Sequence, residues 1–222
     1  MKNSLVLAVI SLAFLGLGAC ATSSLPTTEE LSPTETEGLL LFSISQQGWK
    51  IAEITVSFRD SDGNNVRRVK TADGILGPAW KENNGFDFLL SGGGGHLFAL
   101  RLPPGEYEIH RWSVSTGVAS YYPSSDFSLP FSIKRGKSTY MGDFNFTMGK
   151  GHNLFGIPIQ FLDDIAYLNS WERDLNALRS KYPSMNLLEV DFSGLEFGVD
   201  LEGADGPDRA VNMPPYVAPV VR

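Results

Sequence analysis

The residues of this 222-residue chain that could take part in chemistry are few and lie far apart. Cys20 is the only cysteine, and the three histidines are His96, His110 and His152. No histidine lies in an H-E-x-x-H arrangement, and no G-x-S-x-G sequence is present. The sequence therefore predicts no catalytic residue, while a Ser-His-Asp triad assembled only in the tertiary structure stays open as an alternative.

Three glycine-containing segments resemble ligand loops but are better explained as turns. Asp60, Asp62 and Asn64 place oxygen atoms at alternate positions around Gly63, as calcium loops do, yet the bidentate Glu of an EF-hand is absent. Gly136-Lys137-Ser138 lacks the earlier glycine of a phosphate loop. Gly92–Gly95 has no adjacent lysine and opens no predicted helix that would complete an anion site, and we expect a flexible loop between strands. Asp60, Asp62 and Asn64 thus remain a weak metal candidate, and no cofactor is predicted.

The sequence around Cys20 predicts a modification of its thiol. Lys2 is followed by an uninterrupted apolar and small run, Leu5–Leu17, which has the length of a signal-peptide core and is too short to span a bilayer. Leu17-Gly18-Ala19-Cys20 resembles the lipobox of bacterial lipoproteins. This resemblance implies that residues 1–19 are a cleaved signal peptide and that the Cys20 thiol carries a diacylglyceryl group. Ala21-Thr22, without Asp, resembles the sorting pattern for the outer membrane of Gram-negative bacteria.

The segment that follows Cys20 has the composition of a flexible tether. From residue 21 to residue 37, all positions are Ser, Thr, Pro or Glu except Ala21, Leu25 and Leu31. Such a segment buries too little apolar surface to order itself. We therefore predict a tether over residues 20–37 that reaches roughly 20 to 25 Å as a coil and about 60 Å when stretched.

The charge of the chain limits its partners. The formal net charge of −7 argues against nucleic acid and against adhesion to anionic lipid through charge alone. Membrane attachment must then depend on acyl chains, of which two or more are needed for stable binding.

Residues 38–202 are predicted to form one mainly β domain. Apolar and polar residues alternate in Ile54–Phe58, in Phe127–Ile133 and in Tyr140–Phe146, where Tyr140, Phe144 and Phe146 are expected on one face. Turn residues separate these runs, which favours an antiparallel β-sandwich. Further strands are expected at 39–45, 86–91, 96–102, 106–114, 187–192 and 195–200.

One amphipathic helix is predicted near the end of this domain, over about residues 163–182. Apolar residues recur there at spacings of three and four, Asp163 or Asp164 can cap the start, and Pro183 stops the helix. Residues 203–222 contain four prolines and are predicted to be extended or disordered.

Two segments resemble a known class of β-sandwich. Leu100–Ile109, which contains Pro103-Pro104-Gly105, resembles the turn and strand of transthyretin-like and carboxypeptidase-regulatory-like modules, and Phe131–Gly142 resembles the following hairpin in envelope lipoproteins. The resemblance implies a prealbumin/Ig-like sandwich, with Tyr107 at a strand corner. It implies no peptidase activity.

The function that these features favour is a lipid-anchored, non-enzymatic module that binds or scaffolds an envelope protein or glycan. Aromatic residues that could stack on sugars or on a partner are Trp49, Trp80, Trp112, Tyr121 and Tyr122. One alternative is an envelope hydrolase of glycan or peptide with a histidine as general base. Another is a module that binds calcium or a small ligand.

Overall fold

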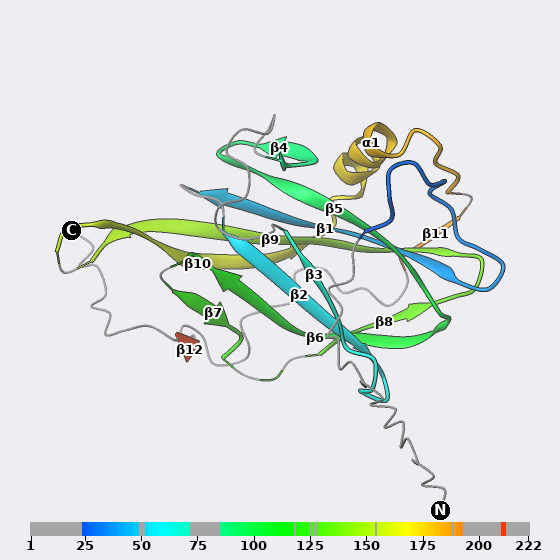
Figure 1. Ribbon diagram of the computed structural model, residues 1–222, viewed down its shortest axis with the longest axis horizontal. Coiled ribbons are helices and arrows are strands. Elements are labelled where there is room, and N and C mark those ends of the chain that lie inside the picture. Colours follow the sequence, from blue (N-terminus) through cyan, green and yellow to red (C-terminus); the bar gives the residue numbers. More distant parts are fainter. Residues whose placement is uncertain are drawn as a thin grey trace, which may run out of the picture.

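The structure is a computed structural model that describes residues 24–48, 52–71, 85–117, 119–124, 126, 128–153, 155–187, 189–192 and 210–211, without the side chains of the last pair. It confirms a mainly β fold with a single α-helix among these residues (Figure 1). The predicted signal peptide, Cys20, the strand at 195–200, Trp49 and Trp80 lie outside the described residues.

The first sheet has six strands in the order β10-β9-β1-β5-β4, with β11 also paired to β9. Its members are β1 (Gly38–Gly48), β4 (Phe88–Leu90), β5 (Gly93–Leu102), β9 (Ser138–His152), β10 (Pro158–Leu168) and β11 (Val190–Asp191). The pairings of β9 with β1 and β11 are parallel, and the others are antiparallel. The sequence pattern favours purely antiparallel pairing. The first sheet differs from this prediction because two of its pairings are parallel.

The second sheet also has six strands, in the order β12-β7-β6-β2-β3, with β8 also paired to β6. Its members are β2 (Glu53–Asp60), β3 (Arg67–Lys70), β6 (Gly105–Ser115), β7 (Ser120–Tyr122), β8 (Leu129–Ile133) and β12 (Ala210–Val211). All of its pairings are antiparallel. The short strand β12 shows that residues 210–211 of the tail are extended against β7.

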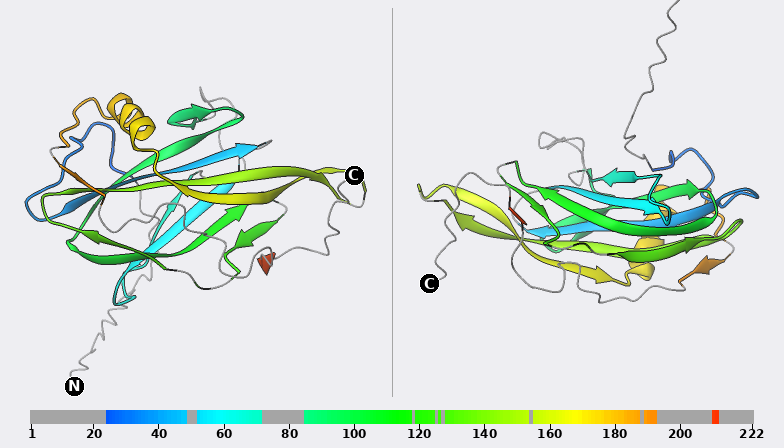
Figure 2. Two further views of the ribbon diagram at one scale, coloured as in Figure 1. Left: turned by 180° about the vertical axis from the view of Figure 1, so that it is seen from behind. Right: turned by 90° about the horizontal axis from the view of Figure 1, so that it is seen from below.

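The two sheets share one hydrophobic core, and a second core lies on the other face of the first sheet. Strand β1 contributes to both, because Leu40 and Phe42 belong to the core between the sheets, whereas Leu39 and Leu41 pack beneath the helix. The continuous apolar run of β1 thus reflects burial on both faces. Figure 2 shows the helix on one side of the first sheet and the second sheet on the other.

A bulge in β9 changes the side chains that share a face. Leu41 pairs with Tyr140 but Ser43 pairs with Asp143, so one extra residue is accommodated around Gly142, whose φ is +93°. Tyr140 therefore packs beneath the helix, while Phe144 enters the core between the sheets. The prediction that these two aromatic residues share one face is wrong, because simple alternation does not allow for the bulge.

The helix is shorter than predicted. It spans Trp171–Lys181 as α1, whereas residues 163–168 belong to strand β10. Ile165 and Tyr167 alternate into the core between the sheets, and β10 keeps its ladder with β9 on both sides of a bulge near Asp163. Residues 163–168 have apolar residues at helical spacing, but their hydrogen-bonded pairing with β9 makes them a strand. No described helix is long and apolar enough to cross a membrane.

Gly93–Gly95 lies in strand β5, not in the predicted flexible loop. A Cβ atom at Gly95 would lie 2.2 Å from the Phe88 ring, and one at Gly93 would lie 1.9 Å from the carbonyl oxygen of Gln46. The glycines are needed because neighbouring strands and rings approach the backbone here. Only Ser91 and Gly92 form the turn.

Residues 24–37 are packed against the fold, so the predicted flexible tether is wrong for this part of it. We call this segment the strap (Ser24–Glu37). Leu31 is fully buried, and Leu25 packs against the same core beneath α1. Leu25 and Leu31, the two apolar residues named above that lie in the strap, attach it to the fold.

Candidate functional site

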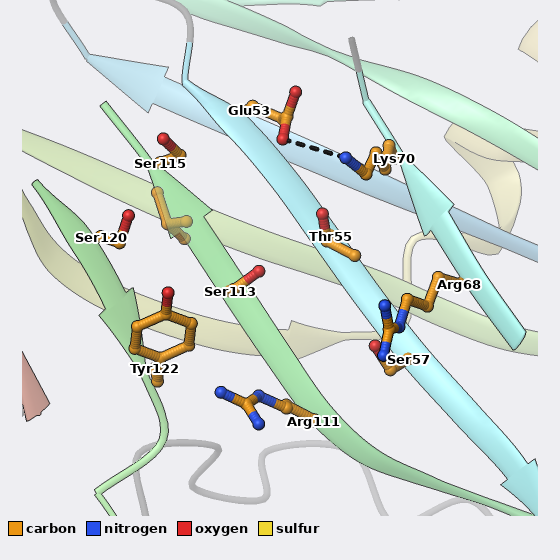
Figure 3. Close-up of a pocket in the computed structure, with 11 residues that line it drawn as sticks. Glu53, Thr55, Ser57, Arg68, Lys70, Arg111, Ser113, Ser115, Ser120 and Tyr122 are labelled. Atoms are coloured by element: carbon orange, nitrogen blue, oxygen red, sulfur yellow. Dashed lines mark hydrogen bonds and ion pairs between the residues drawn. The ribbon is translucent and has the colours of Figure 1, made fainter. Parts of the chain in front are cut away.

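The candidate site is a polar groove on the outer face of the second sheet, with a volume of about 490 Å³ (Figure 3). We refer to it as the groove. Its lining comes from β2, β3, β6 and β7, and comprises Glu53, Thr55, Ser57, Arg68, Lys70, Arg111, Ser113, Val114, Ser115, Ser120 and Tyr122.

The groove arises from the sizes of side chains in successive cross-strand rows. In one row, Ser57 of β2 lies between Arg68 of β3 and Arg111 of β6. In the next, Thr55 lies between Lys70 and Ser113. Short hydroxyl side chains therefore form the floor, and long cationic side chains form the walls. Neighbouring strands are about 4.8 Å apart, so the Cα atoms of Arg68 and Arg111 are separated by roughly 10 Å.

The groove carries positive charge that the described residues do not fully neutralise. Arg68 and Arg111 form no hydrogen bond or ion pair with any described residue, and the Arg111 guanidinium carbon lies 4.9 Å from the centre of the Tyr122 ring. Lys70 is paired with Glu53 at 3.3 Å, and Glu53 is the only acidic residue in the lining. Two unpaired guanidinium groups and a row of hydroxyl groups suit a ligand that bears anionic and hydroxyl groups.

The electrostatics beside the groove agree with this positive charge. His110 is the extra residue at a bulge of β6, and burial lowers its pKa. Arg59, Arg111 and Arg68 lower the pKa of His110 further, although Glu108 opposes them. Burial and nearby cations, of which Arg68 and Arg111 line the groove, thus disfavour the charged form of this histidine.

The histidines are not arranged for catalysis. His96 packs against Phe86 with ring centres 5.2 Å apart, and burial lowers the pKa of His96. Among the described residues, His96 makes no contact with His110 or His152. In the described part of the chain, no histidine nitrogen is hydrogen-bonded to a serine hydroxyl or a carboxylate. The described residues thus give the hydrolase alternative no support.

The Asp60 carboxylate stabilises a turn. Its Oδ1 atom accepts hydrogen bonds from the backbone N–H groups of Asn64 at 2.8 Å and Asn65 at 3.3 Å, and its Oδ2 atom accepts one from the Asn65 side chain. The Asn65 side-chain hydrogen bond lowers the pKa of Asp60 most. No group of three metal-ligating side chains is found among the described residues. Asp60, Asp62 and Asn64 therefore form a hairpin turn between β2 and β3.

The aromatic candidates divide between core and groove. Trp112 and Tyr121 are buried, whereas Tyr122 is half-buried and lines the groove. Tyr107 lies near the start of β6, where its hydroxyl donates to the Pro103 carbonyl at 2.9 Å and its ring stacks on Phe131.

A second polar group of residues lies between α1 and the first sheet, and we call it the polar cluster. It consists of Ser43, Ser45, Tyr140, Asp143, Asn145, Arg173 and Asp174. Asp143 and Asp174 are both fully buried, and one cation, Arg173, lies within 3.0 Å of Asp143 and 2.6 Å of Asp174.

Hydrogen bonds complete the polar cluster. Asp174 Oδ2 lies 2.6 Å from Ser43 Oγ and accepts from the Tyr140 hydroxyl at 2.7 Å, while Asp143 Oδ2 accepts from Ser45 Oγ at 2.8 Å. Burial raises the pKa of Asp174, although the bonds from Ser43 and Tyr140 and the charge of Arg173 oppose this effect. Because its atoms are engaged with one another beneath the helix, the polar cluster attaches α1 to the sheet.

Sequence reasoning identified only part of the groove. It placed Glu53, Thr55 and Ser57 on the outer face of a strand, and it marked Tyr122 as an aromatic candidate. It missed Arg68, Lys70 and Arg111, because strands β3 and β7 are short and their register is not encoded locally. The basic character of Arg67–Lys70, next to a hairpin turn, was the available signal.

Comparison with known proteins adds no assignment. No family model, no curated protein and no solved structure matches this chain.

Proposed function

We propose that this chain is a lipid-anchored, non-enzymatic binding protein of the bacterial cell envelope, and that it binds an anionic glycan in the groove. The observation that carries the binding part is the row of Arg68, Ser57 and Arg111, which exposes two guanidinium groups that no described residue pairs, in a chain of net charge −7. Guanidinium groups bind carboxylate and phosphate with two parallel hydrogen bonds.

The glycan class follows from the remainder of the lining. Five serine and threonine hydroxyl groups offer both donors and acceptors, and Tyr122 offers a ring face against which a sugar can stack. Val114 is the one aliphatic residue among the described lining residues, and it is buried in the core between the sheets, so the groove does not suit an apolar ligand. An anionic, hydroxyl-rich polymer complements the charge and the hydrogen-bonding capacity of the groove.

The anchor and the fold class are part of the same proposal. The lipobox resemblance at Leu17–Cys20 and the absence of any other cysteine support acylation of Cys20, and Ala21-Thr22 favours the outer membrane of a Gram-negative bacterium. Two sheets around one core and the corner hydrogen bond of Tyr107 support a prealbumin/Ig-like sandwich. This compartment brings the groove within reach of acidic envelope glycans.

Calorimetric titration of the mature chain carrying Cys20→Ser tests the groove. The probes are muropeptides, which carry carboxylates, and the phosphorylated core oligosaccharide of lipopolysaccharide, with a neutral N-acetylglucosamine oligomer as the control ligand. We expect one anionic probe to bind more tightly than the neutral one. The double variant Arg68→Gln/Arg111→Gln should weaken its binding about tenfold or more, because two charge-assisted contacts are lost.

A matched variant controls for net charge. Arg135→Gln/Arg179→Gln removes two exposed cations outside the groove, from a turn and from the last turn of α1. It should bind the anionic probe like the wild type. The proposal is wrong if neither anionic probe binds, or if both double variants weaken binding equally. If a crosslinking experiment found only an envelope protein bound to the groove, that protein would replace the glycan as the proposed ligand.

A further inference from the structure

We infer that the strap holds the fold directly against the membrane, with the α1 side facing the lipid surface and the groove facing away from it. This inference rests on the lipid anchor at Cys20 proposed above. It concerns an interaction surface that the sequence did not suggest, because a flexible tether would let the fold stand away from the membrane and turn freely.

The first end of the strap is fixed to Tyr182 and to β5, beyond the residues of β5 that pair with β4. The Leu25 N–H donates to the Ala99 carbonyl at 2.8 Å, and the Ala99 N–H donates to Ser24 Oγ at 2.9 Å. The Tyr182 hydroxyl donates to the Leu25 carbonyl at 2.9 Å, and its oxygen lies 3.1 Å from Ser24 Oγ. Tyr182 is itself fully buried. The strap is therefore attached to the sheet at its first described residues.

Further contacts attach the middle of the strap. Leu31 is buried, its N–H donates to the Ser184 carbonyl at 3.0 Å, and its carbonyl accepts from the Asn186 N–H at 3.0 Å. Arg101 lies across the same segment, because its Nη1 atom is 2.8 Å from the Glu29 carboxylate and its Nη2 atom donates to the Glu30 carbonyl at 2.9 Å. Apolar burial, backbone pairing and an ion pair thus act on one short segment.

The docked strap limits how far Cys20 can lie from the fold. Four residue steps separate Cys20 from Ser24, and four extended residues span at most about 14 Å. The seventeen residues of an undocked tether would span about 60 Å. An acylated Cys20 must lie at the lipid surface, so this surface lies within about 14 Å of Ser24.

The position of Ser24 determines which face meets the lipid. Ser24 and Tyr182 belong to the layer that contains α1, on the outer face of the first sheet. The groove lies on the outer face of the second sheet, and the core between the two sheets is about 10 Å thick. Figure 1 and Figure 2 show the blue strap beside α1, with the second sheet on the opposite side of the first. The groove therefore opens away from the membrane, toward a glycan in the aqueous space.

Energy transfer from two sites to a labelled membrane tests this orientation. Lipidated full-length protein carrying Thr27→Cys in the strap or Ser113→Cys in the groove is labelled with a donor dye, since acylation blocks the Cys20 thiol. It is reconstituted in phosphatidylethanolamine and phosphatidylglycerol vesicles that contain a headgroup-labelled acceptor. We expect clearly higher transfer efficiency from residue 27 than from residue 113.

Two matched insertions test whether the short connection causes the difference. A Gly/Ser insertion of about twelve residues between Thr22 and Ser23 should remove the difference, because it lengthens the connection without touching the strap. The same insertion after Arg222 should leave the difference unchanged. Neither insertion interrupts a described strand, the helix or the strap, and the circular dichroism spectrum of each variant reports whether it is folded.

The outcomes separate this inference from the proposed anchor. Equal transfer from both sites in acylated wild-type protein, or a difference that persists after the insertion at residue 22, overturns the orientation and leaves the anchor intact. A protein that incorporates no labelled fatty acid and does not associate with vesicles overturns the anchor and, with it, the orientation. Binding of glycan in the groove is measured separately and is unaffected by either result.

Discussion

At the scale of single residues, buried charge is concentrated at Asp143, Arg173 and Asp174. These side chains are held by serine and tyrosine hydroxyls between α1 and the first sheet. A buried ion pair contributes little net stability compared with apolar side chains of the same size. Removing one member is costly, however, because the remaining charges and hydroxyls lose their partners.

Asp174→Ala is expected to lower the free energy of unfolding by about 1 to 3 kcal/mol, because the hydroxyls of Ser43 and Tyr140 lose a buried acceptor while Arg173 keeps Asp143. Urea denaturation followed by circular dichroism measures this change. Asn176→Ala, on the exposed side of the same helix, should change the free energy by less than about 0.5 kcal/mol. Equal effects of the two substitutions would show that the polar cluster does not stabilise the fold.

A pH dependence is expected from His96. Burial lowers its pKa below the usual 6.5, and Lys181 acts in the same direction while Asp87 opposes it. The unfolded chain therefore binds this proton more tightly than the folded protein, so stability falls as the pH drops below about 6.5. His96→Gln should flatten the decrease in unfolding free energy between roughly pH 7 and pH 5.

The control for this pH dependence is His152→Gln, which changes an exposed imidazole at the end of β9. Part of the slope should remain in the His96 variant, because burial also lowers the pKa of His110. If His96→Gln and the wild type lost stability in parallel over this range, protonation of His96 would not be responsible.

At the scale of elements, the strap is the main departure from the sequence pattern. The segment is rich in Ser, Thr, Pro and Glu, and this composition correctly indicates that it cannot fold alone. The first sheet supplies the missing apolar surface, since Leu25 and Leu31 pack with Leu178, Tyr182 and Leu97. Two leucines are enough because the core that they enter is provided by other elements.

Leu31→Ala is expected to lower the free energy of unfolding by about 2 to 5 kcal/mol, because the removed atoms leave a cavity in a fully buried site. Thermal or urea denaturation of the mature chain with Cys20→Ser provides the measurement. The exposed neighbour Thr28→Ala should have almost no effect. A free tether predicts almost no change in the free energy of unfolding for either substitution. That result would contradict the docking of the strap.

The strands of the groove show why a site can escape sequence reasoning. The alternation of polar and apolar residues predicts which side chains of β2 face outward and which side chains of β6 face the core. The placement of Arg68 opposite Ser57 and of Ser57 opposite Arg111 depends on two registers and on a bulge at His110. A shift of one residue would turn these side chains to the other face.

At the scale of the whole molecule, the two cores are joined through shared strands. Strand β1 places Phe42 in one core and Leu41 in the other, and β9 places Phe144 and Tyr140 in the same way. A structural change on the helix side must therefore affect the strands that support the core between the sheets. The strap, α1 and both sheets should behave as one unit.

Unfolding by urea is accordingly expected to be a single cooperative transition. Far-ultraviolet circular dichroism, which reports on the sheets, and hydrogen exchange in the peptide that contains α1 should give the same midpoint. The Asp174→Ala variant should lower both midpoints together. Separate loss of protection in α1, with the sheets intact, would show that the helix and the strap form an independent unit.

The sequence by itself determined the mainly β composition, several strands and the turn at Pro103–Gly105, because these depend on local alternation and turn residues. It also supplied the prediction of acylation at Cys20, which no contact in the described residues tests. The end of β10, the phase change at Gly142, the docking of the strap and the row of Arg68 and Arg111 were decided only by the tertiary structure. Each depends on a partner distant in sequence, and a local pattern carries no information about which surface that partner provides.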